Sequence, residues 1–99
     1  MNTMQLNPFE LNTERTFALA HFLTACEKEG VKVNGITSVY NGFQVRFEGT
    51  EGDAILHDGS VGRGLCLWET YKFPWDEGDV STHDADELAH MIAEFQKGE

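Results

Sequence analysis

The fold of this chain is decided by residues 36–47, which read ITSVYNGFQVRF. Two stretches of alternating apolar and polar residues flank Asn41-Gly42, and this pair indicates a hairpin because a type I′ turn needs positive φ at both central residues. A two-residue turn also fixes the register of the strands. The expected facing pairs, all on the side that covers the core, are Tyr40 with Phe43, Ser38 with Val45, and Ile36 with Phe47. The other, more solvated side is expected to carry Thr37, Val39, Gln44, Arg46 and Glu48.

Two more strands are predicted to extend this hairpin into an antiparallel meander. The third covers Asp53–His57 and the fourth covers Leu65–Phe73. The glycine-punctuated stretch 59–64 lies between them and is typical of a flexible connection. After the fourth strand, the composition of Asp76-Glu77-Gly78-Asp79 predicts a loop.

An N-terminal helix is predicted from Thr13 to Glu29, after an irregular lead-in over residues 1–12 in which Asn12 is a suitable N-cap. Apolar residues spaced by three and four positions form its buried stripe, Leu19, Phe22, Leu23 and Cys26. Phe17 falls on the polar side of this helix. We therefore expect the lead-in to fold back and cover Phe17 with Leu6, Phe9 or Leu11.

A second helix of about fourteen residues closes the chain, and either Ser81–Asp84 or Asp84–Glu87 can serve as its capping box. Its expected buried face is Ala85, Leu88, Ala89, Met91, Ile92 and Phe95. Its expected solvent face is Asp86, Glu87, His90, Glu94 and Lys97. The prediction is one α+β domain over residues 1–99, in which an N-terminal helix, a four-stranded antiparallel meander and a C-terminal helix form two layers.

The chain is strongly acidic, with 17 Asp and Glu against 7 Lys and Arg and a net charge of −10. A polyanion of this size is repelled by bare nucleic acid and by anionic membranes, which excludes both as direct partners. No apolar run approaches the roughly 18 residues that a membrane span needs. We therefore expect a cytoplasmic protein, in which Cys26 and Cys66 are buried free thiols.

Most of the excess charge lies in one segment. Residues 73–96 contain seven acids and no Lys or Arg, whereas residues 1–72 contain nine acids and six bases. Two explanations remain open. Carboxylates in the first turn of a helix are favoured by its dipole, and acids in a loop serve solubility. Alternatively, a row of carboxylates with aromatic residues beside it can attract the Arg and Lys side chains of a partner.

No catalytic, metal or cofactor motif stands out, so we expect a protein that is not an enzyme. His83 and His90 are seven positions apart, whereas a helical metal site favours a spacing of about three or four. His57-Asp58 before Gly59 is typical of an Asx turn. A further hypothesis is a ligand-binding or enzymatic domain that uses His57, Asp58 and the glycine stretch 59–64.

In size, in its hairpin through Asn41-Gly42 and in its uninterrupted acidic segment Phe73–Gln96, the chain resembles the small acidic α+β proteins that phages encode against host defences. Anti-CRISPR proteins are the best-known group of this kind. The resemblance implies an inhibitor that occupies a nucleic-acid channel of an RNA-guided nuclease as a DNA mimic, in the cytoplasm of the host cell. Immunity proteins that neutralise nuclease toxins bind a basic target by the same electrostatic attraction.

The leading hypothesis is therefore an inhibitory binding protein that covers a basic nucleic-acid site of a nuclease or defence complex. The residues predicted to make this contact are Asp76, Glu77, Asp79, Asp86, Glu87 and Glu94, with Tyr71 and Trp75 as aromatic anchors. Trp75 is also typical of a lid at a sheet edge. The alternative function is an adaptor or immunity-type protein that binds through its sheet, around Thr37, Val39, Gln44 and Arg46, with acidity serving solubility only.

Overall fold

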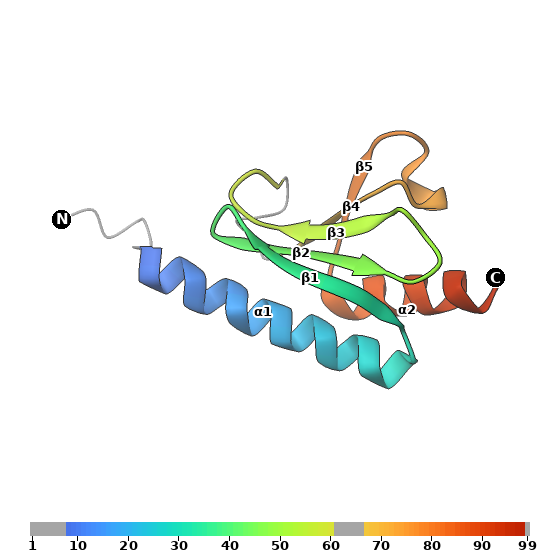
Figure 1. Ribbon diagram of the computed structural model, residues 1–99, viewed down its shortest axis with the longest axis horizontal. Coiled ribbons are helices and arrows are strands. Elements are labelled where there is room, and N and C mark those ends of the chain that lie inside the picture. The colour runs from blue at the N-terminus through green and yellow to red at the C-terminus, as the bar shows by residue number, and fades with distance from the viewer. Residues whose placement is uncertain (1–7, 61–66, 99) are drawn as a thin grey trace.

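The architecture combines two helices with one antiparallel sheet, as seen in a computed structural model that describes residues 8–60 and 67–98. The elements in chain order are α1 (Pro8–Glu29), β1 (Val33–Val39), β2 (Gly42–Phe47), β3 (Asp53–Leu56), β4 (Trp68–Tyr71), the 3₁₀-helix η2 (Pro74–Asp76), β5 (Val80–His83) and α2 (Ala85–Lys97). Every strand pairs with its neighbour in sequence, in the order β1-β2-β3-β4-β5 (Figure 1). The α+β class is confirmed, but the sheet has five strands instead of the predicted four.

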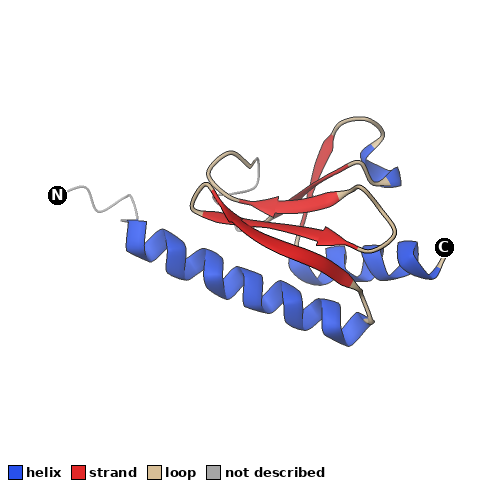
Figure 2. Cartoon of the chain, in the orientation of Figure 1, coloured by secondary structure: helices blue, strands red, loops and turns tan. Residues whose placement is uncertain are grey.

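Both helices pack on the same face of the sheet (Figure 2). The core contains Phe22 and Cys26 from α1, Leu88 and Ile92 from α2, and Trp68 from β4, all of which are buried. Polar contacts join the helices, because His21 Nε2 lies 3.2 Å from Asp86 Oδ1 and His90 Nδ1 lies 3.3 Å from Glu29 Oε1. The predicted two-layer arrangement is therefore confirmed.

Helix α1 begins five residues before the predicted start at Thr13, so the expectation of an irregular lead-in up to residue 12 is wrong for residues 8–12. Pro8 is well suited to a first helical position, because its φ is already near the helical value and its missing N–H would have no partner there. Asn12 consequently lies inside the helix. The prediction that the lead-in covers Phe17 is also wrong, since Phe17 is 70% exposed.

The β1–β2 hairpin is confirmed, but its turn lies one residue earlier than predicted. Tyr40 and Asn41 occupy the two central positions, with φ of 44° and 58°. The observed pairs are Val39 with Gly42, Ser38 with Phe43, and Ile36 with Val45. Gly42 is needed for a different reason from the one expected. A Cβ there would lie 2.0 Å from the carbonyl oxygen of Leu56 and 2.6 Å from the Cα of His57, so β3 can approach only a glycine.

Strand β1 is the outer strand of the sheet, and this position changes the burial of its side chains. Val45 and Phe47 of β2 are buried as predicted, but Ile36 and Tyr40 are 45% and 75% exposed, so their expected place in the core is wrong. On the opposite, polar face, Arg46 donates hydrogen bonds to Gln44 Oε1 at 3.0 Å and to Thr37 Oγ1 at 2.9 Å. The polar character predicted for that face is confirmed.

The strand that the sequence did not predict is β5. Residues 77–79 form a loop as predicted, but Asp76 ends η2 and the loop leads into a four-residue strand that pairs with β4, and not directly into a helix cap. The cap of α2 is Asp84, whose carboxylate accepts a hydrogen bond from Glu87 N at 2.8 Å, so the capping box at Ser81 is excluded. The predicted fourth strand corresponds to β4, and its first positions, Leu65 and Cys66, lie outside the described residues.

Candidate functional site

The predicted contact residues do not form one surface. Glu77 and Asp79 lie in the turn between η2 and β5, whereas Asp86 and Glu87 begin α2, at the other end of β5 (Figure 1). A strand of four residues separates these places by about 13 Å, at about 3.3 Å per residue. Glu94 lies ~12 Å along the helix axis from Asp86, near the end of α2 whose Phe95 packs against Phe73 and Trp75. The acidic segment therefore divides into a turn and a helix face.

Asp76 was predicted to contact a partner, but it is only 5% exposed and belongs to the interior of the turn. Its carboxylate accepts hydrogen bonds from Thr70 Oγ1 at 2.9 Å, from Phe73 N at 3.2 Å and from the hydroxyl of Ser81. Burying a charged carboxylate is costly unless its lone pairs are satisfied, and these donors satisfy them. Asp76 holds the β4–β5 connection together and is not available to a partner.

The same hydrogen bonds determine which nitrogen of His83 carries a proton. Ser81 Oγ donates its single hydrogen to Asp76, so it can only accept from His83 Nε2, which lies 2.8 Å away. The other ring nitrogen, Nδ1, lies 3.5 Å from Glu87 Oε1. His83 therefore connects the buried Asp76 to the first turn of α2. The sequence pattern indicated no such role for His83, which was considered there as a metal ligand.

Trp75, the second predicted anchor, packs within the protein. Its ring stacks on Phe73 with 4.6 Å between centroids and 5° between planes, and it meets Phe95 edge-on. Its indole nitrogen donates to Thr70 Oγ1 at 3.0 Å. This is the role of a lid at a sheet edge. Tyr71, in contrast, is 44% exposed at the end of β4.

The acidic residues at the start of α2 line an open groove against α1. This groove has a volume of about 600 Å³ and is lined by Ala18, His21, Asp84, Ala85, Asp86 and Glu87, which we call the acidic groove. Asp86 and Glu87 are exposed, and the positive end of the α2 dipole favours them there. Phe17 is 70% exposed and lies one turn before His21 on the same side of α1, so its ring lies next to the part of that helix that lines the groove. Phe17 was not predicted as a site residue, because the lead-in was expected to cover it.

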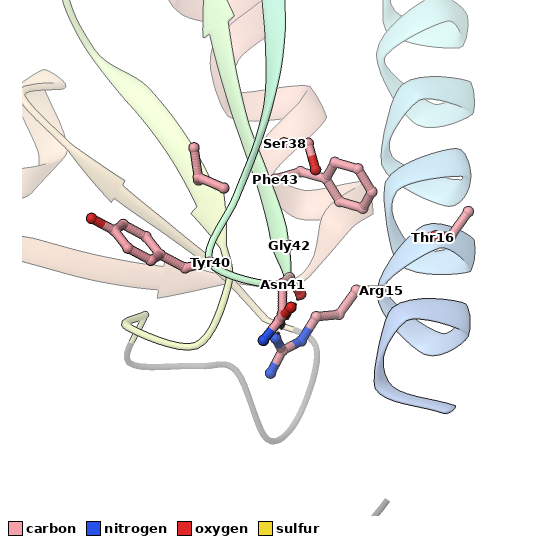
Figure 3. Close-up of a pocket in the computed structure, with 8 residues that line it drawn as sticks. Arg15, Thr16, Ser38, Tyr40, Asn41, Gly42 and Phe43 are labelled. Atoms are coloured by element: carbon pink, nitrogen blue, oxygen red, sulfur yellow. Dashed lines mark hydrogen bonds between the residues drawn. The ribbon is translucent and has the colours of Figure 1, made fainter. Parts of the chain in front are cut away.

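A second pocket, of about 320 Å³, lies between α1 and the β1–β2 turn. In Figure 3, Arg15 reaches from α1 to Asn41 at the turn, while Ser38 and Phe43 extend from the sheet toward the helix. Arg15 donates to the carbonyl oxygen of Asn41 at 2.8 Å and to Asp58 Oδ1 at 2.7 Å, and its side chain is only 5% exposed. The guanidinium thus ties α1 to the hairpin.

The residues of the ligand-binding hypothesis also have structural partners. His57 Nδ1 accepts a hydrogen bond from Gly59 N at 2.9 Å, and Asp58 Oδ2 accepts from Asn41 Nδ2 at 2.8 Å. This agrees with the predicted local turn. Residues 61–64 of the glycine stretch lie outside the described part of the chain. Among the residues described, no group of three or more His, Cys, Asp or Glu side chains is arranged to hold a metal ion.

Cys26 is buried in α1, as predicted, and burial raises the pKa of its thiol to about 12 because the thiolate is poorly solvated there. We expect iodoacetamide at pH 8 to leave Cys26 unmodified in the native protein and to modify it in urea. In the unfolded chain the thiol ionises near its ordinary pKa of about 8.5. The stability that depends on the protonated thiol is therefore complete below that pH and is lost as the pH rises toward 12.

Peptide mapping by mass spectrometry distinguishes Cys26 from Cys66 in this experiment. Modification of Cys26 at the same rate with and without urea would contradict the burial of its thiol. Comparison of Cys26→Ala with the parent chain in alkaline urea titrations isolates the contribution of this group to the pH dependence.

None of the helices in the described ranges is both long and apolar enough to cross a membrane. Comparisons with protein-family models, with curated proteins and with solved structures found no match to this chain.

Proposed function

We propose that this protein is an inhibitory binding protein that covers a basic nucleic-acid-binding site of a nuclease or defence complex and competes there with nucleic acid. The surface that makes this contact is the acidic groove together with Phe17. The observation that carries the proposal is the groove in which the carboxylates that begin α2 meet His21 of α1, one helical turn from the 70% exposed ring of Phe17. Exposed aromatic and acidic side chains in one place are what a basic protein surface recognises.

The charge of this region supports a basic partner. Residues 73–96 contain no Lys or Arg, and the side chains that face the two carboxylates are imidazoles: His21 Nε2 lies 3.2 Å from Asp86 Oδ1 and His83 Nδ1 lies 3.5 Å from Glu87 Oε1. The carboxylate of the N-cap Asp84 accepts a hydrogen bond from Glu87 N at 2.8 Å, so Asp84 and Glu87 lie close together at the start of α2. A partner that binds phosphates with Arg and Lys side chains meets a comparable row of negative oxygens here.

Phe17 adds an apolar contact that charge alone does not provide. Long-range attraction between opposite charges accelerates association, whereas a buried aromatic ring slows dissociation. Such a protein acts by occupying a site and not by catalysis, and it needs no cofactor. As an inhibitor of a phage-directed defence, it would work in the cytoplasm of a host cell.

The proposal predicts that D86N/E87Q weakens binding to the partner at least about tenfold, or about 1.4 kcal/mol, mainly through slower association at low salt. The partner is captured from host lysate by the wild-type protein and identified. Binding is then measured by surface plasmon resonance, and competition is measured with a fluorescent DNA duplex bound to the partner. Phe17→Ser is expected to weaken the same complex through faster dissociation.

The matched control is E27Q/E51Q, which changes the net charge by the same amount at two exposed positions outside the groove. It should bind within about twofold of wild type, apart from a small long-range effect. Equal losses for the two double variants would mean that net charge alone matters. Wild-type affinity in D86N/E87Q and Phe17→Ser would refute the groove as the contact surface.

The adaptor function through the sheet is supported by one observation, the exposed outer strand β1. In that case, Val39→Asp abolishes binding to the partner, whereas D86N/E87Q leaves it unchanged. The two functions therefore give opposite results with the same pair of variants.

A further inference from the structure

The guanidinium group of Arg15 uses only part of its hydrogen-bonding capacity within the described part of the chain. Its Nη1 donates both of its hydrogens, one to the carbonyl oxygen of Asn41 and one to Asp58 Oδ1. A guanidinium carries five N–H groups, so one on Nε and two on Nη2 are left. Nε–H and one N–H of Nη2 lie parallel on one edge of the planar group. This edge has the geometry that binds both oxygens of a carboxylate.

These N–H groups belong to a side chain that is almost enclosed. The Arg15 side chain is 5% exposed. Among the described residues, however, Trp68 Nε1 is the one fully buried side-chain polar atom without a hydrogen-bond partner. Nε and Nη2 of Arg15 therefore keep contact with solvent, and the pocket of about 320 Å³ that Arg15 lines provides this contact. A charged donor in such a place is stabilised by an acceptor that enters the pocket.

The walls of this pocket, which we call the Arg15 pocket, are suited to a ligand with an apolar body. The walls consist of Arg15 and Thr16 of α1, Ser38, the turn residues 39–42, and Phe43. Phe43 packs against the core and is half-buried, and its ring extends toward α1 (Figure 3). Ser38 points to the same side and adds a hydroxyl group at an exposed position.

The charges around the Arg15 pocket favour a single negative group. None of the described residues that line it is Asp or Glu, although the chain contains 17 of these acids. The carboxylate that faces the guanidinium from outside the lining is Asp58, and it binds Nη1. Asp58 is 49% exposed, so it balances the charge of Arg15 without occupying the edge formed by Nε and Nη2.

The size and the position of the Arg15 pocket limit the kind of ligand. A volume of about 320 Å³ is at the lower end of the range for small-molecule sites. A ring or a short chain with one carboxylate matches this volume and the single donor edge. The Arg15 pocket shares no lining residue with the acidic groove, so this inference does not depend on the proposed function.

We propose that the Arg15 pocket is a binding site for a small organic monocarboxylate. The ligand carboxylate accepts hydrogen bonds from Nε and Nη2 of Arg15, and its apolar body lies against the ring of Phe43. The bound ligand contacts α1 and the β1–β2 hairpin together. Its binding consequently stabilises the folded chain.

Nuclear magnetic resonance of the full chain tests this assignment, with benzoate as the probe and benzamide as its neutral counterpart. The chain contains three arginines, Arg15, Arg46 and Arg63, so Arg46→Lys and Arg63→Lys identify the Nε–H signal of Arg15. Benzoate at millimolar concentration should shift this signal in a saturable way and raise the melting temperature. Benzamide should do neither, because it lacks the second carboxylate oxygen and the charge.

Ser38→Phe places a ring in the Arg15 pocket from an exposed position and should weaken benzoate binding at least about tenfold. Ile36→Phe is the matched control. It makes a comparable change on the same side of β1, at a residue that is 45% exposed and does not line the pocket, so it should bind benzoate as wild type does. Circular dichroism establishes that both variants are folded.

The proposal would be overturned if the Arg15 signal of the wild-type chain showed no saturable shift with benzoate, or the same shift with benzamide. Tighter binding of inorganic phosphate than of benzoate would exclude a monocarboxylate as the ligand. Wild-type affinity for benzoate in Ser38→Phe would exclude the Arg15 pocket as its site.

Discussion

Asp76→Asn is expected to lower the free energy of unfolding by about 1–3 kcal/mol, since the Phe73 N–H, which donates to Oδ2, loses its acceptor even when the asparagine oxygen takes the place of Oδ1. The carboxylate accepts from Thr70, Phe73 and Ser81 in a site that is closed to solvent. An asparagine of the same shape offers one acceptor oxygen, which can serve Thr70 and Ser81, and its NH₂ group then faces the N–H of Phe73. In a domain of this size the melting temperature should fall by roughly 4–8 °C per kcal/mol.

Asp79→Asn is the control, because it removes the same charge from the same turn at an exposed position. Asp79 Oδ1 accepts a hydrogen bond from Val80 N at 2.8 Å, and the asparagine carbonyl can replace it. Its stability should stay within about 0.5 kcal/mol of wild type. Thermal and urea unfolding of the two variants would show equal effects if Asp76 were a solvated surface acid.

Gly42→Ala is expected to destabilise the protein by about 3 kcal/mol or more, at the upper end of overpacking effects. The added Cβ would overlap the carbonyl oxygen of Leu56 and approach the Cα of His57. Both atoms belong to the backbone of the neighbouring segment, so a side-chain rotation cannot relieve the overlap. The β2–β3 pair must separate at that end, and urea unfolding measures the loss.

Gly35→Ala provides the comparison within the same hairpin. The nearest atom to a Cβ at that position is Arg46 Nη2 at 3.4 Å, at the end of a flexible side chain. Its φ is not in the left-handed region, so we expect a change within about 0.5 kcal/mol. If both alanine variants were equally stable, the close approach of β3 to Gly42 would be wrong.

The sequence predicted most of the fold because several elements are strongly periodic. The stripe of α1, the alternation around Asn41-Gly42 and the buried face of α2 each specify an element and its inward side. Strand β5 was missed because it has only four residues, and its Ser81 and His83 bind polar groups of the turn and of α2. Such contacts do not appear in the local pattern of apolar and polar residues from which a strand is predicted. The turn position was missed because the need for Gly42 comes from β3, and not from the hairpin itself.

The candidate site was only partly predictable for a similar reason. Composition identifies Asp76, Asp79 and Asp86 equally as acids, but only the fold shows that Asp76 is buried and that Asp86 lines the groove. Phe17 became part of the site because α1 continues back to Pro8 and does not fold over it. The distribution of charge along the chain identified the acidic segment, whereas the exposure of each acid within it depended on tertiary packing.

The way in which α1 and α2 meet also has a consequence for the order of folding. Each strand pairs with its neighbour in sequence, so the sheet can form through short loop closures that are fast. The helix layer is different, because Lys32 N donates to Gln96 Oε1 at 2.8 Å, and 64 positions separate these residues. A nascent chain therefore leaves the ribosome with the apolar face of its sheet incompletely covered until α2 has emerged. Completion of the core therefore waits for α2, and the interval before it is when this protein is most exposed to aggregation and proteolysis.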